Sequence, residues 1–286
     1  VNLHQTNICG NHISYNRLGG IRIERSQIYN LQITGNDIEY NNHRAFDADP
    51  EPTAEIYIDT TAEPSAVDEV TIASNTIQAT PSPGGANIRV LNKKGEGPAP
   101  GLWTITGNII GNQENNVHLT GCYGIVLSGN CIYSCDQRNV LLEDCSLITM
   151  TGNNFRRHTP RLHTGVRLVN SQDCVISGSS FRDDSEAGQT SGASLLELNA
   201  CRRISVQGVQ LLDGAPWGLD AVDCREVNVN GCTFGGDLIR NRGKGAIRFS
   251  GTGEKNLIAA CQIDGALKLG ENAGVKVLNS IGEGIV

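Results

Sequence analysis

Two acidic residues and two arginines in the second half of the chain are of types suited to acid–base chemistry on a charged substrate. Glu197 and Asp220 stand at the same place in the short alternations LLEL and GLDA, and Arg167 and Arg248 occupy that place in GVRL and AIRF. Two carboxylates held close repel one another, which favours one protonated and one ionised group. Arginines beside them can bind a substrate carboxylate or stabilise developing negative charge. These four residues form the predicted catalytic group.

The four side chains meet only if the segments that carry them stack, and a repeated phrase predicts such a stack. The phrase is an apolar alternation, then Gly-Asn, one further residue, and an aliphatic residue or Phe. It recurs at intervals of roughly 22 to 39 residues, with strand-like alternation and no helical spacing, which is typical of a solenoid. Its clearest copies are ICGNHI, ITGNDI, IASNTI, ITGNII, LSGNCI and MTGNNF, which begin at Ile8, Ile33, Ile72, Ile105, Leu127 and Met150.

These coils resemble the right-handed parallel β-helix of the pectin-lyase-like superfamily, most clearly over NVHLTGCYGIVLSGN (116–130) and NVLLEDCSLITMTGN (139–153). The resemblance implies an all-β solenoid of about 10 or 11 coils, with residues 1–286 as a single β-helix domain. Right-handed winding is also the rule for parallel crossovers. Because the pattern starts in the first residues and runs to the last, we interpret the chain as a fragment of a longer protein that lacks one or both caps. The superfamily includes lyases, hydrolases, epimerases and tailspikes, so function must come from the residues.

The repeated Asn and Cys residues have structural explanations. Asn tolerates left-handed backbone angles at a corner, and its amide can bond the Asn one coil away, which predicts an asparagine ladder. Aligning the coils places Cys122, Cys145, Cys201 and Cys224 in one column, with Ser171 in the same slot. No Cys-x-x-Cys pair occurs, so we expect buried thiols rather than disulfides or zinc ligands.

Successive side chains of a strand point to opposite faces, so the parity of a residue's position in each apolar alternation predicts whether its side chain points outward. On the strand before each Gly-Asn the outward column is neutral: Gln32, Thr71, Thr104, Val126, Thr149, Val175, Ser205 and Asn228. On the preceding strand it is largely ionisable, and we call this column the ridge: Arg22, Tyr57, Arg89, His118, Leu141, Arg167, Glu197, Asp220, Arg248 and Lys268. In enzymes of the resembled superfamily the substrate cleft lies along one such sheet. The alternative is that the ridge holds ordinary cross-strand ion pairs on an exposed sheet.

Further residues are predicted to bind substrate beside the ridge, from ridge strands or from inserted loops. They are His118, His163, Arg161, Asp184, Trp217, Lys244 and Lys268. Trp217 can stack on a sugar ring, whereas Trp103 falls at an inward position and is expected in the core. Asp47, Asp49 and Glu51 could present carboxylates to Ca²⁺, or simply form an acidic surface loop.

Charge and motifs exclude several classes of function. The net charge of −7 without a basic cluster argues against nucleic acid as a partner, no apolar run is long enough for a membrane span, and nucleotide-binding motifs are absent. We predict an extracellular, cell-surface or periplasmic enzyme that hydrolyses a polysaccharide, an acidic one, through paired carboxylates and without a cofactor. One alternative is a uronan lyase or epimerase with Arg167, Arg248, Lys244 or His163 as base, in which Ca²⁺ could neutralise the uronate. The other is a non-catalytic β-helix of a tailspike or surface protein that binds a cell-surface glycan.

Overall fold

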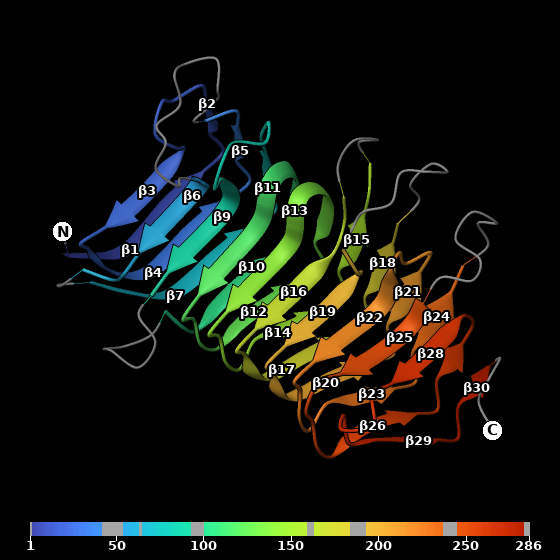
Figure 1. Cartoon of the computed structure of the whole chain (residues 1–286). Coiled ribbons are helices and arrows are strands. Elements are labelled where there is room, and N and C mark those ends of the chain that lie inside the picture. The colour runs from blue at the N-terminus through green and yellow to red at the C-terminus, as the bar shows by residue number, and fades with distance from the viewer. Residues whose placement is uncertain are drawn as a thin grey trace.

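The chain forms an elongated stack of β-coils. The computed structural model describes residues 2–41, 54–62, 65–92, 100–158, 163–183, 193–236 and 245–282. All paired strands in these ranges run parallel to their neighbours one coil away, apart from one isolated antiparallel bridge. Figure 1 shows the coils following one another from the N-terminal to the C-terminal end. The predicted all-β right-handed parallel β-helix is confirmed. In the described ranges no helix is long and apolar enough to cross a membrane.

Each complete coil contributes strands to three rows. The first row is a continuous eleven-stranded sheet. Its strands are β1 (Asn2–Cys9), β4 (Gln27–Thr34), β7 (Ala66–Ala73), β10 (Trp103–Thr106), β12 (Ile125–Ser128), β14 (Thr149–Thr151), β17 (Gln172–Ser177), β20 (Arg202–Gln207), β23 (Asn228–Asn230), β26 (Asn256–Ala259) and β29 (Val275–Leu278).

The second row follows each Gly-Asn corner and consists mainly of strands of two or three residues. These are β2 (His12–Ser14), β5 (Asp37–Glu39), β8 (Thr76–Gln78), β15 (Asn154–Arg156), β18 (Ser180–Arg182), β21 (Gln210–Leu212), β24 (Thr233–Gly235), β27 (Gln262–Ile263) and β30 (Ile281–Gly282). The sequence pattern predicts only two strands in each coil and not this row, because an alternation such as Asp37-Ile38-Glu39 is too short to stand out as a strand.

The third row carries the ridge. It contains β3 (Ile21–Glu24), β6 (Ala54–Asp59), β9 (Ala86–Leu91), β16 (Val166–Val169), β19 (Leu196–Asn199), β22 (Trp217–Val222), β25 (Gly245–Ser250) and β28 (Ala266–Leu269). Two long strands, β11 (Ile109–Thr120) and β13 (Cys131–Glu143), bend and belong to both the second and the third row.

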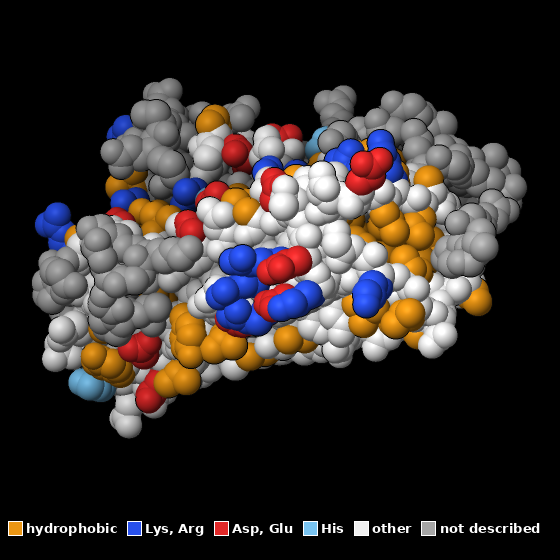
Figure 2. Space-filling view, turned by 60° about the horizontal axis from the view of Figure 1, so that its bottom comes forward, with side chains coloured by type: hydrophobic (Ala, Val, Ile, Leu, Met, Phe, Trp, Pro, Cys, Tyr) orange, Lys and Arg blue, Asp and Glu red, His pale blue; other side chains and the backbone are white. Residues whose placement is uncertain are grey.

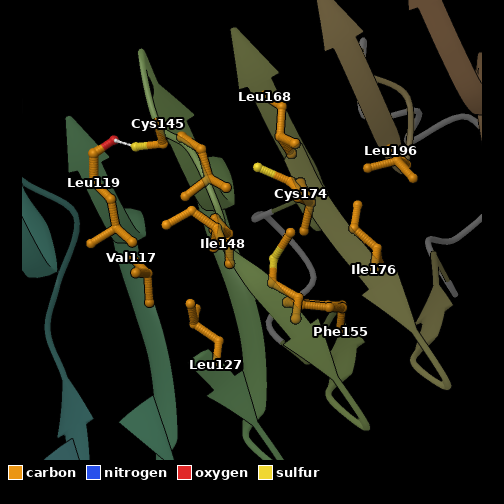
Figure 3. Packing of buried hydrophobic residues seen from close by; sticks show 14 of the residues in the cluster. Val117, Leu119, Leu127, Cys145, Ile148, Phe155, Leu168, Cys174, Ile176 and Leu196 are labelled. Atoms are coloured by element: carbon orange, nitrogen blue, oxygen red, sulfur yellow. Dashed lines mark hydrogen bonds between the residues drawn. The ribbon is translucent and has the colours of Figure 1, made fainter. Parts of the chain in front are cut away.

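The core is a narrow column of aliphatic side chains with a few aromatic rings. Between the terminal coils, inward residues of all three rows are buried, and Figure 3 shows Leu127, Ile148 and Ile176 from successive coils within this core. The rings of Phe155 and Phe181 stack with centroids 4.5 Å apart. Trp103 is 1% exposed and donates its indole N–H to the carbonyl of Val67, which confirms its predicted core position.

The asparagine ladder runs through the first half of the solenoid, as predicted. The side-chain amide of each ladder residue donates to the Oδ1 of the next, from Asn11 through Asn36, Asn75, Asn108 and Asn130 to Asn153. The left-handed backbone angles, however, belong to the residue before each Asn: Gly107 and Gly129 have φ of 63° and 61°. The expectation that Asn adopts them was wrong, because the ladder needs each Asn turned inward, and glycine takes a positive φ without steric cost.

The cysteine column is also present. Cys122, Cys145, Cys201 and Cys224 are buried, and all ten cysteines are free thiols. The Cys145 thiol donates to the carbonyl of Leu119 on the previous coil at 3.3 Å (Figure 3). Ser171 occupies the same slot and accepts the backbone N–H of Cys145. The column therefore supports the corner by hydrogen bonding between coils.

A second ladder ends on a buried carboxylate. Asn16 donates its side-chain amide to Asn41, and Asn41 donates both its backbone N–H and its amide to the carboxyl group of Glu55. Glu55 is 1% exposed, and this burial raises its pKa to about 8 despite the hydrogen bonds from Asn41. The folded protein thus favours the neutral form of Glu55.

We expect Asn130→Ala to destabilise the solenoid by about 2–4 kcal/mol, since it leaves buried groups on both neighbouring coils without partners. Asn130 accepts from Asn108 and donates to the carbonyl of Ile105 and to Asn153. Urea denaturation monitored by circular dichroism measures the change, with Thr104→Ala on the exposed face of β10 as control. A loss no larger than that of the control would contradict a stabilising ladder.

Stability should fall as pH rises through the pKa of Glu55. Its folded-state pKa of about 8 exceeds the ordinary value of 4.5, so the contribution is full below about pH 4.5 and is lost as pH approaches and passes about 8, by on the order of a few kcal/mol. Glu55→Gln, whose amide oxygen can accept both Asn41 donors, should remove this part of the slope. Urea unfolding of both proteins from pH 5 to 9 tests it, and parallel curves would refute the assignment.

Candidate functional site

The ridge lies in register across successive coils. Arg22, Tyr57, Arg89 and His118 pair in sequence along β3, β6, β9 and β11. Leu141 follows on β13, then Arg167 on β16 and Glu197 on β19. Asp220 on β22 pairs with Arg248 on β25, and Arg248 with Lys268 on β28. The neutral column is also in register on the first sheet, from Gln32 to Asn228.

Glu197 is held by contacts from three sides. Arg138 on β13 donates from its guanidinium to the Glu197 carboxylate at 2.7 Å. The Arg167 Nε lies 3.8 Å from the same carboxylate oxygen, and the other oxygen accepts the backbone N–H of Ser194 at 3.0 Å. The Arg138 and Glu197 side chains are only 13% and 19% exposed, so this ion pair is poorly screened by solvent.

Asp220 forms a bidentate ion pair with Arg248. The Arg248 Nε donates to one carboxylate oxygen at 2.7 Å, and the Nη2 donates to the other. These hydrogen bonds raise the pKa of Arg248. The guanidinium also lies 5.5 Å from the ring centroid of Trp217, which places it within cation–π range.

The structure therefore brings together all four predicted catalytic residues and adds a fifth. We define the central cluster as Arg138, Arg167, Glu197, Asp220 and Arg248. Three arginines face two carboxylates, so the cluster carries a net positive charge on a protein whose net charge is −7. Sequence analysis missed Arg138 because it precedes the alternation on β13 and reaches Glu197 across two coils.

A second polar group lies on the N-terminal half of the ridge. The ring of buried His118 shares a 2.7 Å hydrogen bond with Glu143, which points outward two residues beyond Leu141 on β13. Burial lowers the pKa of His118, an effect that Glu143 partly offsets and Arg89 reinforces. Burial also lowers the pKa of Arg89. Extending the parity analysis by one more outward position would have found Glu143.

The remaining predicted binding residues are placed differently. Lys268 is exposed and continues the ridge beyond Arg248. His163 lies at the bend of β13, where its backbone exchanges two hydrogen bonds with Cys135, and its side chain is half-buried. Arg161, Asp184 and Lys244, together with the calcium candidates Asp47, Asp49 and Glu51, lie outside the described residues.

One group within the described ranges has the composition of a metal site. Donor atoms of His12, Asp37 and Glu39 lie within 4.8 Å of one another. His12 already hydrogen-bonds Asp37 at 2.9 Å, and both side chains are exposed. They sit on β2 and β5 in the second row, several coils from the central cluster, so this group has no part in the ridge.

Among the residues that the structure describes, two cavities on the outer surface of the coils lie within reach of charged side chains. One, of about 640 Å³, lies where the third row turns into the first sheet and is lined by Arg202 and Arg225. The other, of about 230 Å³, lies against β21 and β24, beside Arg182 and buried Asp213. The first begins only three residues beyond ridge positions Glu197 and Asp220, at Ala200 and Asp223.

The comparisons agree with this architecture. Residues 56–201, half of the chain, match the sequence model of the right handed beta helix region. The chain belongs to this right-handed β-helix family. No curated protein sequence matches it.

Solved structures resemble this β-helix along most of its length. It is similar to DFA-IIIase from Arthrobacter chlorophenolicus A6 in complex with GF2, with a TM-score of 0.61 and 13% identity over 90% of this chain and 64% of that chain. It is also similar to tailspike protein 2 of Escherichia coli O157:H7 bacteriophage CAB120, with a TM-score of 0.56 and 12% identity over 98% of this chain and 34% of that chain. The β-helix thus spans less than two thirds of either protein, and at these identities the likeness establishes the fold alone.

Asp220 and Arg248 should be energetically coupled within the β-helix. A double-mutant cycle with Asp220→Asn and Arg248→Gln should give a coupling free energy of about 1–3 kcal/mol, since the ion pair is bidentate and Asp220 is largely buried. The exposed pair Asp173–Arg203 serves as a comparison and should give a smaller coupling, because solvent screens it. Equal coupling in the two cycles would show that burial does not strengthen the ridge pair.

Proposed function

We propose that the chain acts on an acidic polysaccharide that lies along the ridge and is cleaved by hydrolysis at the central cluster. The observation that carries this proposal is the cluster itself, in which Arg138, Arg167 and Arg248 surround Glu197 and Asp220. Guanidinium groups form bidentate hydrogen bonds with sugar carboxylates. Because the arginines outnumber the carboxylates, the net positive charge of the cluster favours an anionic chain. The two carboxylates supply the groups that glycoside hydrolysis needs.

The strand register favours a retaining mechanism. Glu197 and Asp220 are direct neighbours on β19 and β22, where strands lie about 4.8 Å apart, close to the roughly 5–5.5 Å between carboxylates of retaining enzymes. Glu197, oriented by Arg138 and the Ser194 N–H, attacks the anomeric carbon. Asp220 donates a proton to the departing glycosidic oxygen, and water then cleaves the glycosyl ester while Asp220 takes up the water proton.

Asp220 can donate a proton only after Arg248 releases it. Both Asp220 oxygens accept hydrogen bonds from Arg248 in the free protein. A substrate carboxylate competes for that guanidinium, and moving Arg248 onto the substrate leaves Asp220 free to take a proton from solvent. The charge of the substrate therefore serves in activation as well as in binding, and a neutral polysaccharide should be a poor substrate.

Activity assays on acidic and neutral polysaccharides test the proposal. Release of reducing ends from an acidic polymer, without an ultraviolet-absorbing unsaturated uronate, is the expected result. Glu197→Gln and Asp220→Asn should each lower the rate by roughly 100-fold or more. Glu226→Gln, which removes one negative charge outside the ridge, is the control and should leave the rate within about threefold. Full activity of either ridge variant would overturn the assignment.

Glycan binding without cleavage is the second candidate, and one observation favours it. Each central carboxylate is already neutralised by arginine, as in a stabilising ion-pair network. Binding of an acidic polysaccharide with no products would support this role, whereas unsaturated uronate would indicate a lyase with His163 or an arginine as base. The likeness to both DFA-IIIase and a phage tailspike agrees with either outcome. With a glycan substrate, we propose an extracellular, cell-surface or periplasmic site of action in each case.

A further inference from the structure

A polar groove lies beside the ridge, at the corner where the third row turns into the first sheet. It has a volume of about 640 Å³ and is lined by Gln172, Arg202, Asp223, Arg225, Thr252 and Glu254, together with backbone from the corner turns. Cavities of this size hold a small oligosaccharide. Figure 2 turns the lower side of the solenoid forward, along which β17, β20 and β23 run, and shows acidic and basic side chains gathered in one compact patch on that face.

Two arginines of this groove stand on successive coils, with no acidic position between them. Arg202 and Arg225 occupy equivalent positions on successive coils and are joined by a parallel backbone bridge. Coils lie about 4.8 Å apart, and like charges at that spacing destabilise a sheet. Arg202 donates to the amide oxygen of Gln172 at 2.8 Å, which directs its guanidinium without neutralising it. Within the described part of the chain, the Arg225 side chain makes no hydrogen bond or ion pair.

Two acidic residues, Asp223 and Glu254, also line the groove, and within the described residues neither forms an ion pair with Arg202 or Arg225. Asp223 accepts the backbone N–H of Thr252 at 2.9 Å, and Glu254 faces Arg225 from the next coil on its other side. The next residue along, Arg203, forms instead an ion pair with Asp173 and does not line the groove. The same corner therefore holds one arginine in an ion pair and two arginines, in register on successive coils, that form none among the described residues. An anion placed between Arg202 and Arg225 would relieve their repulsion and receive charge-assisted hydrogen bonds from both.

We propose that this corner groove is a second binding site for the glycan, with a uronate carboxylate seated between Arg202 and Arg225. The choice of an acidic sugar rests on the proposed function of the ridge, but the site is separate from the central cluster. The groove begins three residues beyond Glu197 and Asp220 along their strands, about 10 Å away at the rise of a β-strand. Gln172, Asp223 and Glu254 supply acceptors and donors for the hydroxyl groups of the sugar. A chain bound on the ridge thus continues over the corner into this groove.

Arginine protection locates the site directly. The unmodified protein is treated with phenylglyoxal, with and without tetragalacturonate, and modified arginines are identified by mass spectrometry. The probe should protect Arg202 and Arg225 but not Arg203, and maltotetraose should protect none of them. Equal protection by the neutral sugar would overturn the uronate assignment, and no protection at Arg202 and Arg225 would overturn the site.

Affinity measurements separate this site from the ridge. By isothermal titration calorimetry, the pair of changes Arg202→Gln and Arg225→Gln should weaken tetragalacturonate binding by about tenfold, whereas Arg203→Gln, a matched loss of charge at the same corner, should not change it. Unchanged affinity in the double variant, together with weaker binding or lost activity in Arg248→Gln, would refute the corner site and leave the ridge proposal intact. The reverse pattern would support the corner and refute the ridge. If the double variant does not fold, protection in the unmodified protein decides.

Discussion

The register between successive coils is the constraint on which the rest of the molecule depends. Parallel strands repeat one backbone spacing, so a polar group buried at a corner finds its partners at matching positions on the neighbouring coils. The ladder from Asn11 to Asn153 meets this requirement, because each amide before Asn153 bonds both the next amide and a backbone carbonyl, and the Asn153 amide bonds the carbonyl of Leu127. A slip by one residue would leave every ladder amide unpaired in the interior and would turn the core side chains outward.

The same register turns scattered residues into continuous columns. Glu197 and Asp220 lie 23 positions apart in the sequence but directly opposite each other on β19 and β22. Arg138 reaches Glu197 although 59 positions separate them in the sequence. Corner positions obey the same rule, which is why Arg202 and Arg225 are in register on successive coils. A solenoid thus concentrates charge wherever equivalent positions share a sign. Loops that differ between coils are then added beside columns of side chains whose positions the register fixes.

Ion pairing connects the stability of the ridge to its proposed chemistry. The arginines that neutralise Glu197 and Asp220 offset the repulsion between these two neighbouring carboxylates, and the same guanidinium groups are the obvious partners for an acidic glycan. Trp217 supports this arrangement, since it lies beneath Arg248 and opposite Gly245 on the next strand, where any larger side chain would collide with the indole ring. Substrate binding would exchange one set of charge pairs for another rather than create charge pairs from unpaired groups.

The sequence by itself determined the periodic features. The Gly-Asn phrase predicted the parallel β-helix, the asparagine ladder and the cysteine column, and strand parity identified every ridge residue, because position within a repeat is a local property. Three features depended on the tertiary structure: the short second-row strands, the reach of Arg138 to Glu197, and the left-handed angle at Gly rather than Asn. These depend on corner geometry and on which rotamers long side chains adopt across several coils, and no repeat pattern encodes them. The corner groove is of the same kind, since its shape arises where turns of unequal length meet in space.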